Sequence, residues 1–305
     1  MLIGPALNAS QIFFALGFVL LAGMAYVFRD WRQLSIAVST PALLYMFVTS
    51  NKIQESPRWL ISQGRTGEAK EILENIAQSN GAQSFKLHSL EMPDKTSSAT
   101  SYGFCTLFTH KHIRLRMAIL TLVWLVNSLI YYGLSFNIKN IEGNRYWNFS
   151  LSGLVEIPSY LVAIPLIDKL GRRKSLFYTV MVAALGCILC GFGPSTFATP
   201  SLMFGKFGIS SSFGILYVYS AELIPTVIRN FAMGTCSMAA RIGGILAPLV
   251  VSMAVIDQKL PMLLLGASGI FAGIIGLFLP ETLNRPVPET LEDRFAVTRT
   301  DKLIA

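Results

Sequence analysis

Residues 205–248 read GKFGISSSFGILYVYSAELIPTVIRNFAMGTCSMAARIGGILAP, and this stretch decides the fold. It holds two long apolar segments, each with one cation inside it, joined by a short loop at residues 221–230. A Lys or Arg near the middle of a membrane helix costs about 2.5 to 3.5 kcal/mol on insertion scales. Lys206 and Arg241 therefore need a compensating environment, such as a watery cavity, a ligand or an anionic partner.

The composition of the whole chain is that of an integral membrane protein. Of its 305 residues, 52% are hydrophobic and only 14% are charged, and the mean hydropathy is +0.53. Soluble domains carry about 25% charged residues. The net charge of +8 does not indicate nucleic-acid binding, because the basic residues are dispersed between apolar segments. We therefore expect membrane lipid, and no nucleic acid, among the partners.

The cysteines and histidines do not indicate an enzyme or a metal site. Cys187 and Cys190 form a C-x-x-C inside an apolar segment without nearby His or further Cys, which favours helix packing over redox chemistry. The three histidines all lie within residues 51–116, without a partnered nucleophile or a metal-ligand constellation. We expect no enzymatic activity and no metal.

Eight apolar segments are long enough to cross a hydrocarbon core of about 30 Å, which takes about 20 helical residues. We therefore expect an all-α membrane protein with helices at residues 11–28, 33–50, 117–136, 147–167, 175–193, 200–220, 231–253 and 260–279. The expected domains are two membrane helices in 1–50, a loop at 51–116, six membrane helices in 117–280 and a tail at 281–305.

The distribution of Lys and Arg orients these segments in the membrane. Eighteen of the 25 lie in the loops and tail on one side, nine of them in residues 51–116, whereas five lie on the other side. The positive-inside rule therefore places the long loop and the C-terminal tail in the cytoplasm.

The long loop is expected to contain one helix and one linker. Residues 65–79 place four apolar side chains on one face and charges on the other, which predicts an amphipathic helix with its apolar face formed by Ala69, Ile72, Leu73 and Ile76. Residues 91–103, EMPDKTSSATSYG, have the composition of a flexible linker.

A short basic loop, DKLGRR at residues 168–173, follows the fourth apolar segment. Gly171 provides the conformational freedom for a sharp turn. Asp168 near a helix C-terminus opposes the helix dipole unless a cation compensates it. The cluster is either a charge contact that breaks when helices move or a simple stop-transfer signal.

Several motifs in order resemble the major facilitator superfamily. DKLGRR resembles its D-R/K-x-G-R-R signature. QESPRWL at 54–60 resembles the P-E-S-P-R-W-L that follows the sixth helix of its organic-ion transporters, solute carrier family 22, with Gln54 in place of Pro. AELIPTVIRN at 221–230 resembles the loop before that family's eleventh helix, and PET at 280–282 resembles the end of its twelfth. GKFG at 205–208 and the RIG that begins at Arg241 resemble the organic cation/carnitine branch.

The resemblance implies a twelve-helix transporter of which this chain matches helices five to twelve. It implies transport of small organic ions across the plasma membrane by alternating access, with no cofactor beyond the sodium coupling found in some members. Carnitine- and anion-type members carry Arg near position 241 where cation-only members carry an acid, so zwitterions such as carnitine are favoured. Organic anions are the next alternative. A sugar porter shares D-x-x-G-R-R and P-E-S-P-R but does not predict Arg241.

The truncation that the resemblance implies leaves a further alternative. With four helices of the first half absent, one wall of the cavity would be absent too. The chain would then be either a shortened working transporter or a non-transporting isoform that binds or regulates a full-length partner, and a homo-oligomer is a third arrangement.

The candidate substrate site centres on the buried charges. Arg241 is the first candidate for a substrate carboxylate, since a buried guanidinium can hold one bidentately. The alternative is a structural ion pair with Glu156, the only acid deep in the fourth segment. Lys206 lies nearer its helix end, so it either snorkels to the extracellular interface or binds a ligand.

Polar and aromatic residues of the third apolar segment complete the candidate site. Tyr131 and Tyr132 offer aromatic faces to a quaternary ammonium group, although aromatic residues are also common in interfacial belts and packed bundles. Asn127, one turn earlier, either contacts ligand or forms an interhelical hydrogen bond. The resemblance further implies a cytoplasmic gate formed by Asp168, Gly171, Arg172, Arg173, Glu222 and Arg229.

Overall fold

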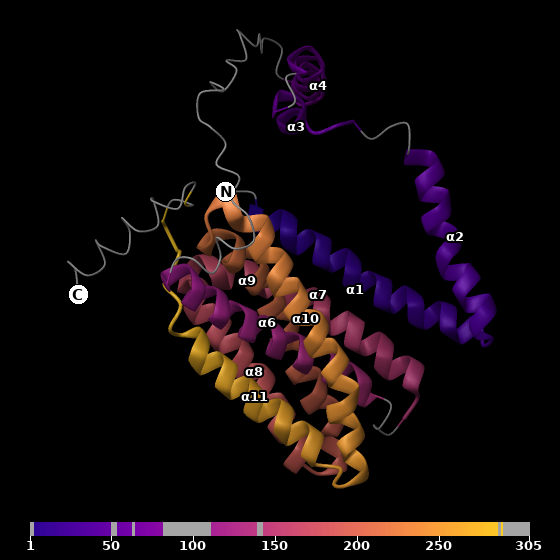
Figure 1. The fold of residues 1–305 in the computed structure, drawn as a ribbon. Helices are drawn as coiled ribbons and strands as arrows, with labels where there is room; N and C mark the ends of the chain where they lie inside the picture. The colour runs from indigo at the N-terminus through magenta and orange to yellow at the C-terminus, as the bar shows by residue number, and fades with distance from the viewer. Residues whose placement is uncertain are drawn as a thin grey trace. The chain divides into compact units, whose positions relative to one another are not determined.

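The computed structural model describes residues 3–49, 54–62, 65–81, 111–138, 143–285 and 288, and within these ranges it is helical without strands. The chain divides into two compact units, which are described separately: residues 1–29 with 102–305 form the larger, and residues 30–101 form the smaller. Figure 1 labels the helices of both units.

The smaller unit contains α2 (Trp31–Thr49), α3 (Pro57–Ser62) and α4 (Thr66–Ser79). The predicted amphipathic helix is confirmed in α4, which packs against α3. Its Ala69 is buried, but Ile76 remains 46% exposed, so the apolar face is covered only in part. An ion pair of 2.7 Å between Arg65 and Glu68 stabilises its first turn. The predicted linker at 91–103 lies outside the described residues.

The larger unit is a helix bundle that brings distant parts of the sequence together. In chain order, its helices are α1 (Ile3–Val27), α6 (Lys111–Asn137), α7 (Arg145–Leu170), α8 (Arg172–Phe192), α9 (Ala198–Leu223), α10 (Arg229–Ser252) and α11 (Leu260–Gly276). The most extensively packed pairs are α6 with α10, α8 with α9, α8 with α11 and α1 with α7. Phe18 of α1 contributes to the last pair, since its ring centroid lies 5.2 Å from that of Phe149.

Each of the eight ranges predicted to be helical contains a helix. Among the described residues, four helical stretches are long and apolar enough to cross a membrane: Ile113–Asn137, Tyr146–Leu170, Arg172–Phe192 and Arg229–Val255. Two shorter apolar helices are Gln11–Val27 and Leu260–Gly276. The number of membrane crossings therefore stays a prediction.

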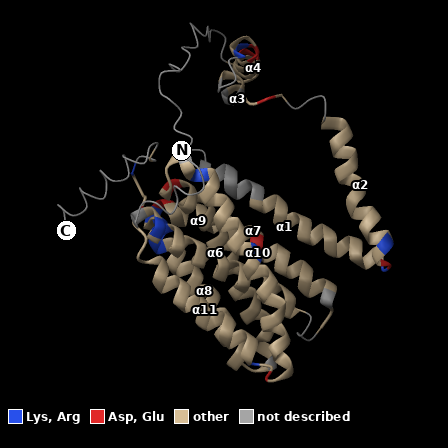
Figure 2. Ribbon diagram, in the orientation of Figure 1, with Lys and Arg blue, Asp and Glu red and all other residues tan. Residues whose placement is uncertain are grey.

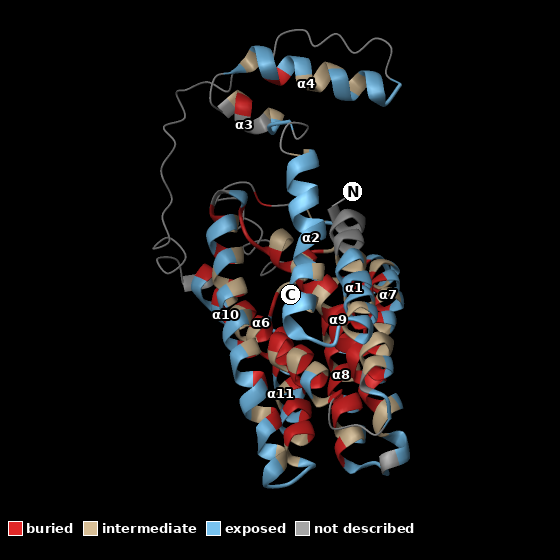
Figure 3. Cartoon of the chain, turned by 90° about the vertical axis from the view of Figure 1, so that its right-hand side faces the viewer, coloured by how far each residue is buried: buried red, intermediate tan, exposed pale blue. Residues whose placement is uncertain are grey.

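The helix α9 forms much of the interior of the larger unit, and Figure 3 shows buried residues along α8 and α9. It is a 26-residue helix with buried serines at positions 210 to 212 and a buried Lys206, which lower its hydropathy. Small residues let helices approach closely in a membrane. Figure 2 shows that charged residues lie mainly toward the ends of the bundle, with a largely uncharged middle.

Cys187 is fully buried in α8, in agreement with the predicted packing role.

Candidate functional site

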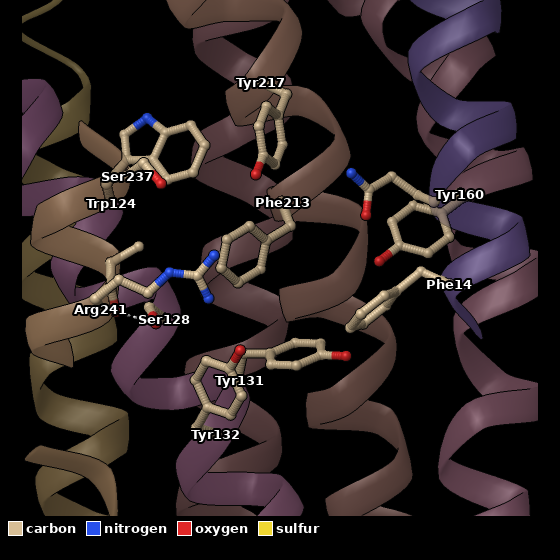
Figure 4. A pocket seen from close by; sticks show the side chains of 12 residues that line it. Phe14, Trp124, Ser128, Tyr131, Tyr132, Tyr160, Phe213, Tyr217, Ser237 and Arg241 are labelled. Atoms are coloured by element: carbon tan, nitrogen blue, oxygen red, sulfur yellow. Dashed lines mark hydrogen bonds between the residues drawn. The ribbon is translucent and has the colours of Figure 1, made fainter. Parts of the chain in front are cut away.

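A cavity of about 300 Å³ lies among five helices of the larger unit, α1, α6, α7, α9 and α10. Its lining is largely aromatic, with one cation (Figure 4): Gln11, Phe14, Trp124, Ser128, Tyr131, Tyr132, Tyr160, Phe213, Tyr217, Ser237, Ala240 and Arg241. A mostly apolar concavity with a few polar groups is the usual form of a small-molecule site.

Helical periodicity explains why these residues share the cavity. Residues three or four apart lie on the same face of a helix. On α6, this spacing aligns Trp124 and Ser128 with the adjacent Tyr131 and Tyr132. On α9, it aligns residues 213 and 217. Edge-to-face contacts fix several rings, including one of 4.6 Å between the centroids of Trp124 and Tyr217.

Arg241 presents an unpaired guanidinium to this cavity. It is an exposed residue, and no hydrogen bond or ion pair joins it to any residue that the structure describes. Its helix is held against α6 by Ser128, whose Oγ donates to the Ala240 carbonyl at 2.6 Å. A side chain at Gly243 would collide with the Leu125 carbonyl, so this glycine permits the close approach. The cation therefore has a fixed backbone and no anionic partner among the residues that the structure describes.

Glu156 and Lys206 form a fully buried ion pair, with 3.1 Å between Glu156 Oε1 and Lys206 Nζ. The predicted alternative of an Arg241–Glu156 pair is therefore wrong. Snorkelling of Lys206 is also wrong, because its side chain is 0% exposed. The Glu156 carboxylate supplies the countercharge that permits the lysine to stay in the interior.

Tyr131 connects this ion pair to the cavity. Its hydroxyl donates to Glu156 Oε1 at 2.8 Å, and Lys206 Nζ lies 3.3 Å from the centroid of its ring. Lys206 also donates to Ser135 Oγ at 2.7 Å. Tyr131 lines the cavity, whereas neither charged residue of the pair does. The ammonium already occupies one face of this ring, which weakens Tyr131 as a cation–π partner for a ligand.

The remaining two candidates differ in position. Tyr132 lines the cavity, but Asn127 does not. Asn127 accepts a hydrogen bond from Ser212 Oγ at 2.7 Å, which matches the interhelical alternative, and its Nδ2 has no partner in the described part of the chain.

Sequence reasoning missed several lining residues: Trp124, Tyr160, Phe213 and Tyr217. The sequence feature that could have identified them is their helical spacing from residues that were already candidates. Trp124 and Tyr160 lie at helical spacing from candidates on their own helices, and the other two lie on the same helix as Lys206. Aromatic residues at such spacing are also common in packed bundles, so spacing alone does not identify a cavity lining.

The second charged site lies where α8 begins and α9 ends. Arg172 and Glu222 form a two-point contact, with 2.9 Å from Nε to Oε2 and 2.9 Å from Nη2 to Oε1. Thr282 Oγ1 also donates to Glu222 Oε2 at 2.7 Å. This planar arrangement is the strong form of an arginine–carboxylate pair, and it joins three segments that are distant in sequence.

Glu281 is a further member that sequence reasoning did not assign to the gate. Its carboxylate accepts from the backbone N–H of Arg172 at 2.8 Å and of Arg173 at 3.1 Å. The expected sharp turn is confirmed at Gly171, which has φ of 85°. Glu281 belongs to the PET motif at 280–282, which the sequence analysis noted. Its contact with the DKLGRR loop, however, could be seen only in the folded structure.

Three other predicted gating residues are not joined into an ion-pair network in the described ranges. Asp168 is exposed and forms no ion pair there. Arg229 donates instead to the Ile224 carbonyl at 3.3 Å and to Thr226 Oγ1 at 3.1 Å. The buried Nε of Arg173 has no hydrogen-bond partner among the described residues.

The apolar bundle, its central cavity and the charged loop at the end of α7 together define a major facilitator-type membrane protein. A family model described as "Sugar (and other) transporter" matches residues 6–293, so the chain belongs to this family of transporters, which are not enzymes. It is an integral multi-pass membrane protein. A solved structure of the proton:xylose symporter XylE from E. coli matches with a TM-score of 0.71 at 20% identity. The match covers 96% of this chain and 67% of the symporter chain. This likeness shows the fold alone.

Relatives in the organic-ion branch are more similar in sequence. An organic cation transporter protein of Drosophila melanogaster is 40% identical over 301 residues, covering 93% of this chain and 54% of the relative. Human organic cation/carnitine transporter 2 is 37% identical over 292 residues, covering 94% of this chain and 52% of the relative. A solute carrier family 22 member 15-like protein of Xenopus laevis is 38% identical over 293 residues, covering 94% of this chain and 60% of the relative, which confirms the resemblance to that family. The chain spans about half the length of these relatives.

Proposed function

We propose that this chain transports small organic ions across the plasma membrane by alternating access, with a carboxylate-bearing zwitterion such as carnitine as its substrate. The observation that carries the proposal is the unpaired Arg241 guanidinium in an aromatic cavity. The names of the relatives, which include organic cation and carnitine transporters, support the same substrate class.

The cavity offers separate surfaces to the two ends of such a zwitterion. Arg241 can hold the carboxylate through two parallel hydrogen bonds. A quaternary ammonium group is attracted to the faces of aromatic rings. Trp124, Tyr132 and Tyr217 line the cavity and are the candidates for this role, because Lys206 already occupies one face of Tyr131.

The contact between Arg172 and Glu222 is proposed to hold the inner end of the bundle closed. It joins the start of α8 to the end of α9 near the Glu281 segment. Movement of these helices would require its separation, which makes it a switchable contact. We propose that Asp168, Arg173 and Arg229 act in the same gate. Coupling to sodium is a further proposal, tested by uptake with and without sodium.

The direct test is uptake of radiolabelled carnitine by cells that express this chain, its Arg241→Ala variant or an Arg114→Ala control. Arg114 is an exposed arginine of α6 that does not line the cavity. We expect Arg241→Ala to lose uptake at equal surface level and Arg114→Ala to retain it. Absence of uptake by the parent chain despite surface delivery would contradict transport by this chain alone. Uptake that changes only with a co-expressed full-length relative would instead favour a regulatory role.

A further inference from the structure

The buried ion pair between Lys206 and Glu156 lies directly behind the wall of the cavity. Tyr131 and Tyr160 line the cavity, and both contact the Glu156 carboxylate from that side. The two charged residues are fully buried and do not line the cavity themselves. A ligand in the cavity would therefore be separated from the pair by tyrosine side chains.

Contacts within the protein occupy both charges. Glu156 Oε1 lies 3.1 Å from Lys206 Nζ and accepts from the Tyr131 hydroxyl at 2.8 Å. Its Oε2 lies 3.5 Å from the Tyr160 hydroxyl. The lysine ammonium has the glutamate, Ser135 Oγ at 2.7 Å and the Tyr131 ring as its neighbours. The carboxylate is thus neutralised inside the protein, and no substrate cation is needed for that purpose.

The net charge that a ligand meets depends on this neutralisation. Arg241 contributes one positive charge to the cavity, while the Lys206–Glu156 pair sums to zero. Without the lysine charge, Glu156 would offset Arg241 across a low-dielectric wall. Without the glutamate charge, the positive charge of Lys206 would add to that of Arg241. The pair therefore affects the charge preference of the cavity in both directions.

We propose that Lys206 is a charge-selectivity residue: by neutralising Glu156, it makes the cavity favour carboxylate-bearing organic ions over organic cations that lack a carboxylate. Lys206 acts through Glu156 and does not contact the substrate. The inference rests on the proposed use of this cavity as the substrate site, and it assigns the basis of its selectivity.

The test measures equilibrium binding of radiolabelled carnitine and choline to purified protein, since choline has a trimethylammonium group but no carboxylate. Lys206→Met should lower the preference for carnitine by about tenfold, and Glu156→Gln should raise it by about tenfold. One unit charge about 10 Å away has an effect of this size at an effective dielectric constant of about 20. The double variant Lys206→Met/Glu156→Gln should keep the parent preference.

Opposite shifts in the two single variants distinguish this role from a structural one, which would weaken both ligands in both variants and leave the preference unchanged. If one single variant does not fold, the direction of the shift in the other decides, and the double variant checks that the site survives replacement of the buried pair by neutral side chains. A changed preference in the double variant, or no binding of either ligand to the parent, would overturn the proposal. The predicted shifts without any carnitine uptake would instead remove the transport proposal and leave this one standing.

Discussion

Gly171 is required at its position for two independent reasons. Its backbone has φ of 85° and ψ of 168°, a region open almost only to glycine. A Cβ atom there would also lie 2.6 Å from Glu281 Oε2, which belongs to the carboxylate that contacts the start of α8. The residue therefore permits both the turn and the approach of the segment after α11.

Substitution Gly171→Ala should destabilise the larger unit. The strained backbone alone costs of order 1 to 3 kcal/mol, and the displaced Glu281 carboxylate adds to this. Thermal unfolding of the purified protein should show a lower Tm. Gly234→Ala is the matched control, since no atom lies within 4 Å of a Cβ placed at this glycine. Equal Tm values for the two variants would contradict the role of Gly171.

At the scale of the element, α8 has an unusual first turn. It begins with Arg172, Arg173 and Lys174, and it contains no acid there. Positive charge at a helix N-terminus opposes the helix dipole, and the first N–H groups need acceptors. Glu281 meets both needs from a distant segment, because its carboxylate accepts from the first two backbone N–H groups. The helix is therefore stabilised by the chain that follows α11.

Substitution Glu281→Gln should remove the charge while keeping the shape of the side chain. We expect a loss of about 1 kcal/mol, the size of a helix N-terminal charge or capping interaction, visible as a lower Tm. Asp168→Asn is the comparison, since Asp168 is exposed and forms no ion pair in the described ranges. It should leave the Tm and surface expression unchanged but lower turnover. A Tm loss in Asp168→Asn as large as that in Glu281→Gln would refute this assignment.

The helices were predictable from the sequence, but their ends and partners were less so. Apolar runs of membrane length identified all eight ranges. The helix α6 nevertheless begins at Lys111 and not at 117. Its first six residues, KHIRLR, are rich in basic side chains, so they lie outside the apolar run from which the helix was predicted. The sequence also showed two cations within apolar segments and one deep acid without revealing which cation pairs with the acid. Lys206 and Glu156 are 50 positions apart, so only the packing of α7 against α9 decides this.

At the scale of the whole molecule, the sequence predicted that Arg241, Tyr131 and Tyr132 would share a site, and all three line one cavity. That prediction depended on finding a cation and two tyrosines within apolar segments of the sequence. The other lining residues, such as Phe213 and Tyr217, could not be separated from packing residues, because membrane helices bury aromatic rings on many faces. The membrane orientation likewise depends on charge counts, with eighteen cations on one side and five on the other.

Cysteine accessibility tests this orientation. Asn80 and Asp257 are both exposed and lie on opposite predicted sides of the membrane. In a variant without the four native cysteines, Asp257→Cys should react with an impermeant thiol reagent in intact cells. Asn80→Cys should react only after permeabilisation. The reverse pattern would invert the topology, and labelling of both sites in intact cells would rule out the predicted crossings.

The central claim is that Arg241 binds the carboxylate of an organic ion in the aromatic cavity. The most direct test is the ratio of carnitine to choline dissociation constants for the parent chain and for Arg241→Gln. Hydrogen bonds to a charged group contribute about 1.5 to 3 kcal/mol, so the parent should favour carnitine by about 10- to 150-fold. The variant should lose this preference because its carnitine affinity falls, whereas removal of a positive charge does not weaken the binding of the choline cation. A preference that survives Arg241→Gln would contradict the account.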